Sequence, residues 1–98
     1  MRVLVLTQDH CGFCDQAHEV LHRLAADYGF EVATIDIGSP EGQQLAERGG
    51  VLFPPGLFLD GEPFSYGRLS ERKLRRELDR RSRTGDQGAT TEARGTAR

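Results

Sequence analysis

The two cysteines of the chain, Cys11 and Cys14, are the residues whose type and spacing point most directly to chemistry. A bond between them would close only a short loop and constrain little of the unfolded chain, which excludes a disulfide-stabilised scaffold. In a reducing compartment such a pair indicates redox chemistry or metal binding. The first six residues lack the apolar length and the cleavage site of a signal peptide, so we expect a cytoplasmic protein.

The cysteine pair lies between an apolar run at residues 3–6, typical of a buried strand, and an amphipathic pattern that begins at Cys11. Free amide groups at a helix start favour an anion, so we expect a thiolate at Cys11 with a lowered pKa. We predict that Cys11 is the exposed nucleophile, which forms a mixed disulfide, and that Cys14 is the resolving thiol. The neighbouring charges oppose each other, because protonated His10 favours the thiolate and Asp9 disfavours it.

A metal site is the alternative interpretation of the same residues. Cys11, Cys14, His18 and His22 have the spacing C-x2-C-x3-H-x3-H. Four residues of one straight helix spread over roughly 16 Å of its axis, so they close a tetrahedron around a metal ion only with difficulty. We therefore prefer redox chemistry, predict no metal ligands, and place the two histidines at the polar edge of the helix.

The rest of the chain supplies the elements that must position the two cysteines. Apolar residues recur at helical spacing as far as Tyr28, and Gly29 is a plausible C-cap. Ser39-Pro40 is typical of a helix start, and Asp60-Gly61 is a strong hairpin signal. The predicted order is βαβαββα, with strands at residues 3–6, 31–37, 57–60 and 62–66, and helices at residues 11–28, at 40–49 and from Ser70 onwards, where Leu74 and Leu78 face inward.

Length and charge set the limits of this fold. Ninety-eight residues fit one domain, and the net charge of −2 combines −6 over residues 1–69 with +4 over residues 70–98. Residues 82–98 contain no large apolar side chain, so we predict a folded domain at residues 1–81 and a disordered tail at residues 82–98. No apolar stretch is long enough to cross a bilayer. Acidic residues interrupt the basic ones of the last helix, so we expect no nucleic-acid partner. We also expect a monomer without a membrane partner.

One further motif makes the pattern specific: Phe53-Pro54-Pro55-Gly56 precedes the third predicted strand. With the element order and the C-x-x-C motif at a helix start, it makes residues 1–81 resemble a glutaredoxin of the dithiol Cys-Gly-Phe-Cys type. The resemblance implies a thioredoxin-like α/β fold, with a four-stranded mixed sheet flanked by helices. It also implies that the bond before Pro55 is cis and that Pro55 lies against the cysteine pair, which keeps backbone groups open to the substrate.

The same resemblance implies a substrate-binding surface that includes Phe13, Pro54, Pro55, Gly67 and Arg68. In this surface Arg68 would hold a cosubstrate carboxylate. A solvated surface arginine is the alternative interpretation.

Several positions depart from the glutaredoxins that use glutathione. Gln8 stands where Lys or Arg is usual, and Phe53-Pro54 stands where Thr-Val is usual. Of the Gly-Gly and polar residues expected before the last helix, only Gly67 and Ser70 correspond. The segment Ser65-Tyr66-Gly67-Arg68 is similar to the glutaredoxin-like redoxins that thioredoxin reductase reduces. These departures leave the electron donor open: the expected reducing cosubstrate is mycothiol, glutathione or thioredoxin reductase. We expect no bound cofactor.

These observations lead to a preferred function and two alternatives. We expect a thiol–disulfide oxidoreductase that reduces protein disulfides or mixed disulfides with small thiols, and so serves electron transfer and cell redox homeostasis. The first alternative is an iron–sulfur or metal-binding carrier, since monothiol glutaredoxins of that kind have Cys-Gly-Phe-Ser where this chain has Cys14 in place of the serine. The second is an interaction domain without catalytic activity.

Overall fold

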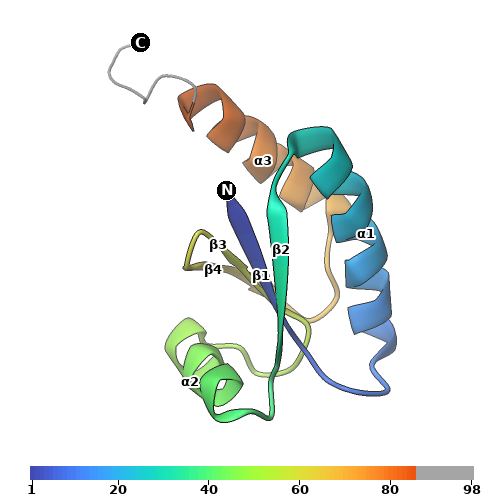
Figure 1. Cartoon of the computed structure of the whole chain (residues 1–98), viewed down its shortest axis with the longest axis vertical. Helices are drawn as coiled ribbons and strands as arrows, with labels where there is room; N and C mark the ends of the chain where they lie inside the picture. Colours follow the sequence, from blue (N-terminus) through green and yellow to red (C-terminus); the bar gives the residue numbers. More distant parts are fainter. Residues whose placement is uncertain (86–98) are drawn as a thin grey trace.

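The computed structural model describes residues 1–85 as one four-stranded sheet with helices on both of its faces (Figure 1). In chain order the elements are β1 (Arg2–Thr7), α1 (Gly12–Tyr28), β2 (Glu31–Asp36), α2 (Pro40–Gly49), β3 (Gly56–Leu59), β4 (Glu62–Tyr66) and α3 (Glu71–Gly85). The sheet order is β2-β1-β3-β4, with β1 and β2 parallel and the other two pairs antiparallel. The predicted thioredoxin-like arrangement with a mixed sheet is confirmed.

The position of each strand follows from its apolar pattern. β1 lies in the interior of the sheet, and Val3, Val5 and Leu6 are fully buried, as its continuous apolar run predicts. β2 lies at one edge, and only Ala33 and Ile35 are half-buried along it. The helix α1 connects these two parallel strands, as a parallel pair requires.

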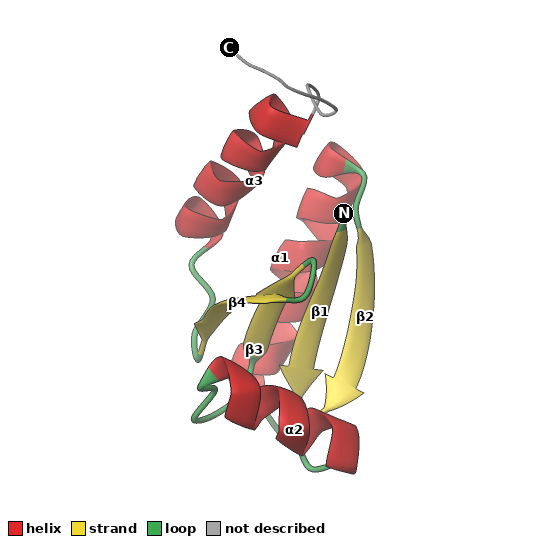
Figure 2. Ribbon diagram, turned by 90° about the vertical axis from the view of Figure 1, so that its left-hand side faces the viewer, coloured by secondary structure: helices red, strands yellow, loops and turns green. Residues whose placement is uncertain are grey.

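The helices cover the two faces of the sheet unequally. Leu57 and Leu59 of β3 belong to the core that α1 and α3 form on one face. The intervening Phe58 faces α2, because a Cβ atom at Gly49 would lie 2.7 Å from its ring. Figure 2 shows α2 on the opposite side of the sheet from α1. The missing side chain at Gly49 thus lets α2 approach the sheet closely.

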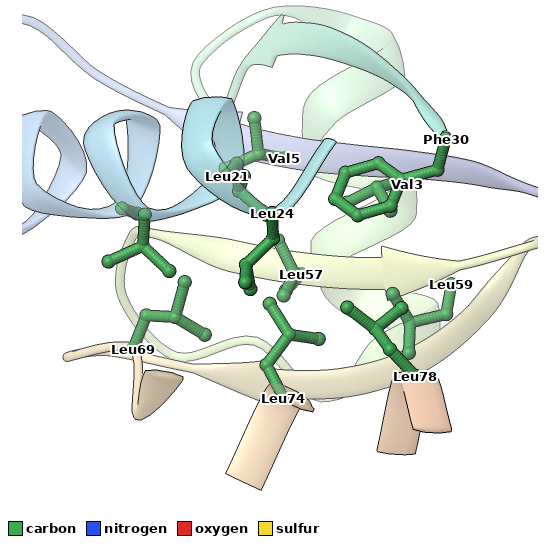
Figure 3. Packing of buried hydrophobic residues seen from close by; sticks show 12 residues of the cluster. Val3, Val5, Leu21, Leu24, Phe30, Leu57, Leu59, Leu69, Leu74 and Leu78 are labelled. Carbon is green, nitrogen blue, oxygen red and sulfur yellow. The ribbon is translucent and has the colours of Figure 1, made fainter. Parts of the chain in front are cut away.

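The main core lies between α1, α3 and the sheet (Figure 3). Leu21 and Leu24 of α1 meet Leu57 of β3, and Leu74 and Leu78 of α3 close the cluster. Each of these leucines is at most 2% exposed. Burial of one such side chain contributes about 1.5–3 kcal/mol. The two leucines predicted to face inward from the last helix therefore attach α3 to the domain.

The predicted start of α2, the predicted end of α1 and the predicted hairpin turn are found in the structure. Ser39 caps α2 through a bond from the Gly42 amide to its Oγ, and Gly29 ends α1 in the left-handed conformation. At the hairpin between β3 and β4, Asp60 and Gly61 both have positive φ angles of 50° and 86°. This geometry is what an Asp-Gly hairpin turn requires.

Two features fix the ends of the central strands. The pairing of β3 with β4 shifts by one residue between Leu57 and Phe58, a bulge that places Tyr66 opposite Gly56. At the other end, the Arg2 amide donates to Asp60 Oδ1 at 2.8 Å, and the Asp60 amide donates to the Arg2 carbonyl at 2.8 Å. The start of the chain is therefore bonded to the β3–β4 hairpin.

The last helix extends further than the sequence predicted. We placed the domain boundary after Arg81, whereas α3 continues to Gly85. Within this helix Glu77 accepts hydrogen bonds from Arg80 and Arg81, which stabilise the turn directly before residues 82–85. Residues 86–98 of the predicted tail lie outside the described residues. Among the described residues, no helix is both long enough and apolar enough to span a membrane.

Candidate active site

The cysteine pair lies at the start of α1. The Sγ atoms of Cys11 and Cys14 are at bonding distance, and their Cα atoms are 5.2 Å apart. Cys11 is the N-cap of the helix, and its Sγ accepts a hydrogen bond from the Cys14 amide at 3.1 Å. Cys14 is only 2% exposed, whereas Cys11 is partly exposed. The two cysteines thus occupy different environments, although only two residues separate them.

This geometry suits the two chemical roles assigned from the sequence. The Cys14 amide and the positive end of the helix dipole both lie at Cys11 Sγ, and both favour negative charge on this sulfur. A substrate sulfur can reach the partly exposed Cys11, but the buried Cys14 can reach only a bond that already involves Cys11. The arrangement is therefore suited to redox chemistry in which Cys11 reacts first.

Pro55 lies at the same end of the sheet as the loop that leads to Cys11. The pairing places Leu6, near the end of β1, beside Gly56, and Gly56 beside Tyr66. The Pro54–Pro55 bond is cis, as the resemblance implied, and the Pro55 carbonyl accepts from the Gly67 amide at 2.9 Å. Pro55 is buried and Pro54 half-buried.

An apolar patch at this end of the sheet was not predicted from the sequence. It consists of Leu52, Phe53 and Tyr66, which are 76%, 52% and 40% exposed. The rings of Phe53 and Tyr66 meet edge to face with centroids 5.2 Å apart. Gly67 has a φ of +77°, and a Cβ atom there would lie 2.7 Å from the Phe53 ring. Exposed apolar groups gathered in this way mark binding surfaces.

Arg68 is exposed and faces a groove between α1 and the start of α3. This α1–α3 groove has a volume of about 520 Å³, and its walls include Gln16, Arg23, Arg68 and Arg72. Gln16 belongs to the first turns of α1, two residues beyond Cys14. Of the residues predicted to bind substrate, Phe13 is half exposed in the first turn of α1, Gly67 lies against the Phe53 ring, and Arg68 lines the groove.

The remaining candidates show no specific interaction with the cysteine pair. Asp9 and His10 are exposed, and neither side chain makes a hydrogen bond or ion pair within residues 1–85. His18 is half-buried and His22 is exposed, which places both at the edge of the buried face of α1. Across the described part of the chain, no group of three or more His, Cys, Asp or Glu side chains is placed to hold a metal ion.

Comparison with known proteins gives a consistent result for family and fold. Residues 2–79 match a family described as "Glutaredoxin-like domain (DUF836)". Uncharacterised proteins of Mycobacterium tuberculosis and Mycobacterium bovis are 34% identical over 85 residues, which cover 81% of this chain and 84% of theirs.

Solved thioredoxin structures resemble the chain as well. A mutant thioredoxin from Halobacterium salinarum is 31% identical with a TM-score of 0.61, and the alignment covers 81% of this chain and 72% of that one. Oxidised thioredoxin O2 from Arabidopsis thaliana has the same TM-score and coverage at 20% identity, which shows a shared fold only.

Proposed function

Because the chain belongs to the glutaredoxin-like domain family and carries its cysteine pair at a helix start, we propose that it is a thiol–disulfide oxidoreductase with glutaredoxin-like activity. Its substrates in this proposal are protein disulfides or mixed disulfides with small thiols. One observation supports the proposal most directly. The partly exposed Cys11 Sγ accepts a bond from the Cys14 amide and lies at bonding distance from a buried partner sulfur.

The reaction proceeds in two exchanges that balance in atoms and electrons. The Cys11 thiolate attacks one sulfur of the substrate disulfide, forms a mixed disulfide and releases the first substrate thiolate with the electron pair of the broken bond. The Cys14 thiolate then attacks Cys11 Sγ and releases the second substrate thiolate. Two electrons have passed to the substrate, and the protein is left with the Cys11–Cys14 disulfide. The two protons that the cysteines release to solvent when they form thiolates are balanced by the two that the product thiolates take up from it.

Reduction of this disulfide requires an external donor. In our proposal the donor is mycothiol, glutathione or thioredoxin reductase, and the reaction takes place in the cytoplasm, because a dithiol reductant needs a reducing compartment. The protein acts as a monomer without a bound cofactor and without nucleic-acid or membrane partners. Incubation of the oxidised protein with each donor in parallel identifies the one that regenerates the dithiol efficiently.

Substitution of each cysteine separately tests the proposed roles. Cys11→Ser should abolish all turnover, because it removes the nucleophile. Cys14→Ser should abolish dithiol reduction and accumulate the mixed disulfide at Cys11, which mass spectrometry detects. A Cys11→Ser variant that retained full disulfide reductase activity would exclude this mechanism. A visible cluster chromophore after anaerobic purification would instead favour the carrier alternative.

A further inference from the structure

The α1–α3 groove runs along the part of α1 that follows the cysteine pair. Gln16, in its wall, follows Cys14 by two residues, and Arg23 lies two helical turns further along α1. On the other wall, Arg68 directly follows Gly67, which supports Phe53 of the apolar patch. The two walls of the groove therefore start, in sequence, directly after the residues at the cysteine pair and at the patch.

The charges that line the α1–α3 groove leave an excess of positive charge. Arg23 is paired with Glu71 at 2.6 Å, and this hydrogen bond, together with one from Arg75, holds the pKa of Glu71 below its usual value. Arg68 and Arg72 make no ion pair or side-chain hydrogen bond within residues 1–85.

One opposing carboxylate, that of Glu19, lies on the α1 wall. The Arg23–Glu71 pair is neutral as a unit, so two guanidinium groups face this single carboxylate across the groove. A guanidinium group is suited to binding a carboxylate through two parallel hydrogen bonds. The groove therefore matches a ligand that carries negative charge.

The length of the groove limits the kind of molecule that can reach its far end. The Arg23–Glu71 pair places the start of α3, and with it Arg72, level with Arg23. The Sγ atom of Cys11, to which the substrate bonds, lies beside that of Cys14. Arg23 follows Cys14 by nine residues, which is about 13 Å along the helix axis at 1.5 Å per residue. An extended polypeptide covers this distance in about four residues. The carboxylates of a tripeptide thiol lie within about one residue of its cysteine and do not extend so far.

We propose that the α1–α3 groove binds an acidic side chain of a polypeptide substrate, about four residues from the cysteine whose disulfide is reduced. This inference rests on the proposed function and specifies its substrate as a protein disulfide with an acidic flank. Arg68 and Arg72 bind the carboxylate, and the apolar patch contacts the residues next to the substrate cysteine. Recognition through the groove adds no chemical step to the two exchanges described above.

A single-turnover assay with designed peptides tests this proposal. The fully reduced protein is mixed with symmetric disulfides of peptides that contain one cysteine, and formation of the Cys11–Cys14 disulfide is followed over time. Two peptides carry Glu four residues before or after the cysteine, and matched peptides carry Gln at the same positions. We expect at least one Glu peptide to react about threefold to tenfold faster than its Gln counterpart at low ionic strength, with the difference decreasing as salt is added.

Variants of three cations on α3 and the preceding loop identify where the preference arises. Arg68→Gln and Arg72→Gln should each reduce the ratio of the Glu-peptide rate to the Gln-peptide rate toward one. Lys73→Gln is the matched control, because Lys73 is exposed and adjacent in sequence but does not line the groove. It should keep the wild-type ratio.

The possible outcomes separate this inference from the proposed function. Equal rates for all peptides, or an equal loss of preference in Lys73→Gln, would overturn the inference and leave the oxidoreductase function intact. If Arg72→Gln slows the reduction of glutathione disulfide as strongly as that of the Glu peptide, the groove binds a small thiol and the inference is wrong. A protein that reduces none of these disulfides would contradict the proposed function, and the inference would fail with it.

Discussion

The Phe53 ring occupies the space that a side chain at residue 67 would need. An alanine in place of Gly67 should therefore displace that ring. Its φ is +77°, and a Cβ atom would lie 2.7 Å from Phe53 Cε2. Gly61 provides a matched control within the same molecule. Its φ is +86°, but an added Cβ atom would meet nothing within 4 Å. Gly67→Ala and Gly61→Ala therefore share the backbone penalty and differ in the contact with Phe53.

The size of the two effects follows from these geometries. An alanine in the left-handed region costs about 1–2 kcal/mol, and both variants lose this amount of stability. Gly67→Ala also displaces the Phe53 ring from its edge-to-face contact with Tyr66, which is worth about 0.5–1.5 kcal/mol. Phe53 is half exposed, so its ring moves outward without opening the core. We expect the free energy of unfolding to fall by about 1 kcal/mol more in Gly67→Ala than in Gly61→Ala.

Urea denaturation of the two variants measures this difference, and the same pair in a Phe53→Ala background tests its cause. Without the Phe53 ring the added methyl group has no ring to displace, so the two alanine variants should lose the same stability. Equal losses in the presence of Phe53, or an unequal loss that persists in the Phe53→Ala background, would refute the role assigned to Gly67.

Two further predictions concern the attachment of α3. Leu74 is fully buried, so Leu74→Ala should lower the free energy of unfolding by about 2–5 kcal/mol in urea denaturation, while Leu52→Ala, at a side chain 76% exposed, should change it by less than about 0.5 kcal/mol. The hydrogen bonds from Arg80 and Arg81 lower the pKa of Glu77 from 4.5 to about 2. The stabilisation by this carboxylate is therefore complete above about pH 4.5 and lost as the pH falls toward 2. Glu77→Gln should lower the free energy of unfolding by about 1 kcal/mol at pH 7, as expected for an ion pair near the surface. The thermal unfolding curves of variant and wild type should converge near pH 2. A constant difference between the two curves at all pH values would contradict the role assigned to Glu77.

The elements of the fold were predictable where the turn and capping residues agreed with the pattern of apolar residues. The continuous apolar run of β1 implied a strand covered on both faces, and Asp60-Gly61 indicated both the hairpin and the antiparallel return of β4. The end of α3 was not predictable from apolar residues, because hydrogen bonds from arginines to Glu77 support the turn directly before residues 82–85. The predicted boundary after Arg81 depended on hydrophobicity alone.

The site was predictable at the cysteines and much less so around them. The order of strand, cysteine pair and helix was enough to place Cys11 at the helix start and Cys14 in the first turn, and the structure shows that Cys11 is the N-cap. The contact between Phe53 and Tyr66 depends on the one-residue bulge between β3 and β4, for which the sequence carries no distinct signal. The α1–α3 groove depends likewise on the ion pair between Arg23 and Glu71, residues 48 positions apart.

The hydrogen bonds between Arg2 and Asp60 have a practical consequence for handling the protein. They hold the amino terminus at the start of β1, whereas the cysteine pair follows the opposite end of the same strand. Figure 1 shows the labelled N-terminus and the beginning of α1 at opposite ends of β1. A molecule immobilised on a sensor surface or an electrode through its amino terminus would therefore present Cys11 toward the solution, accessible to disulfide partners that flow past it.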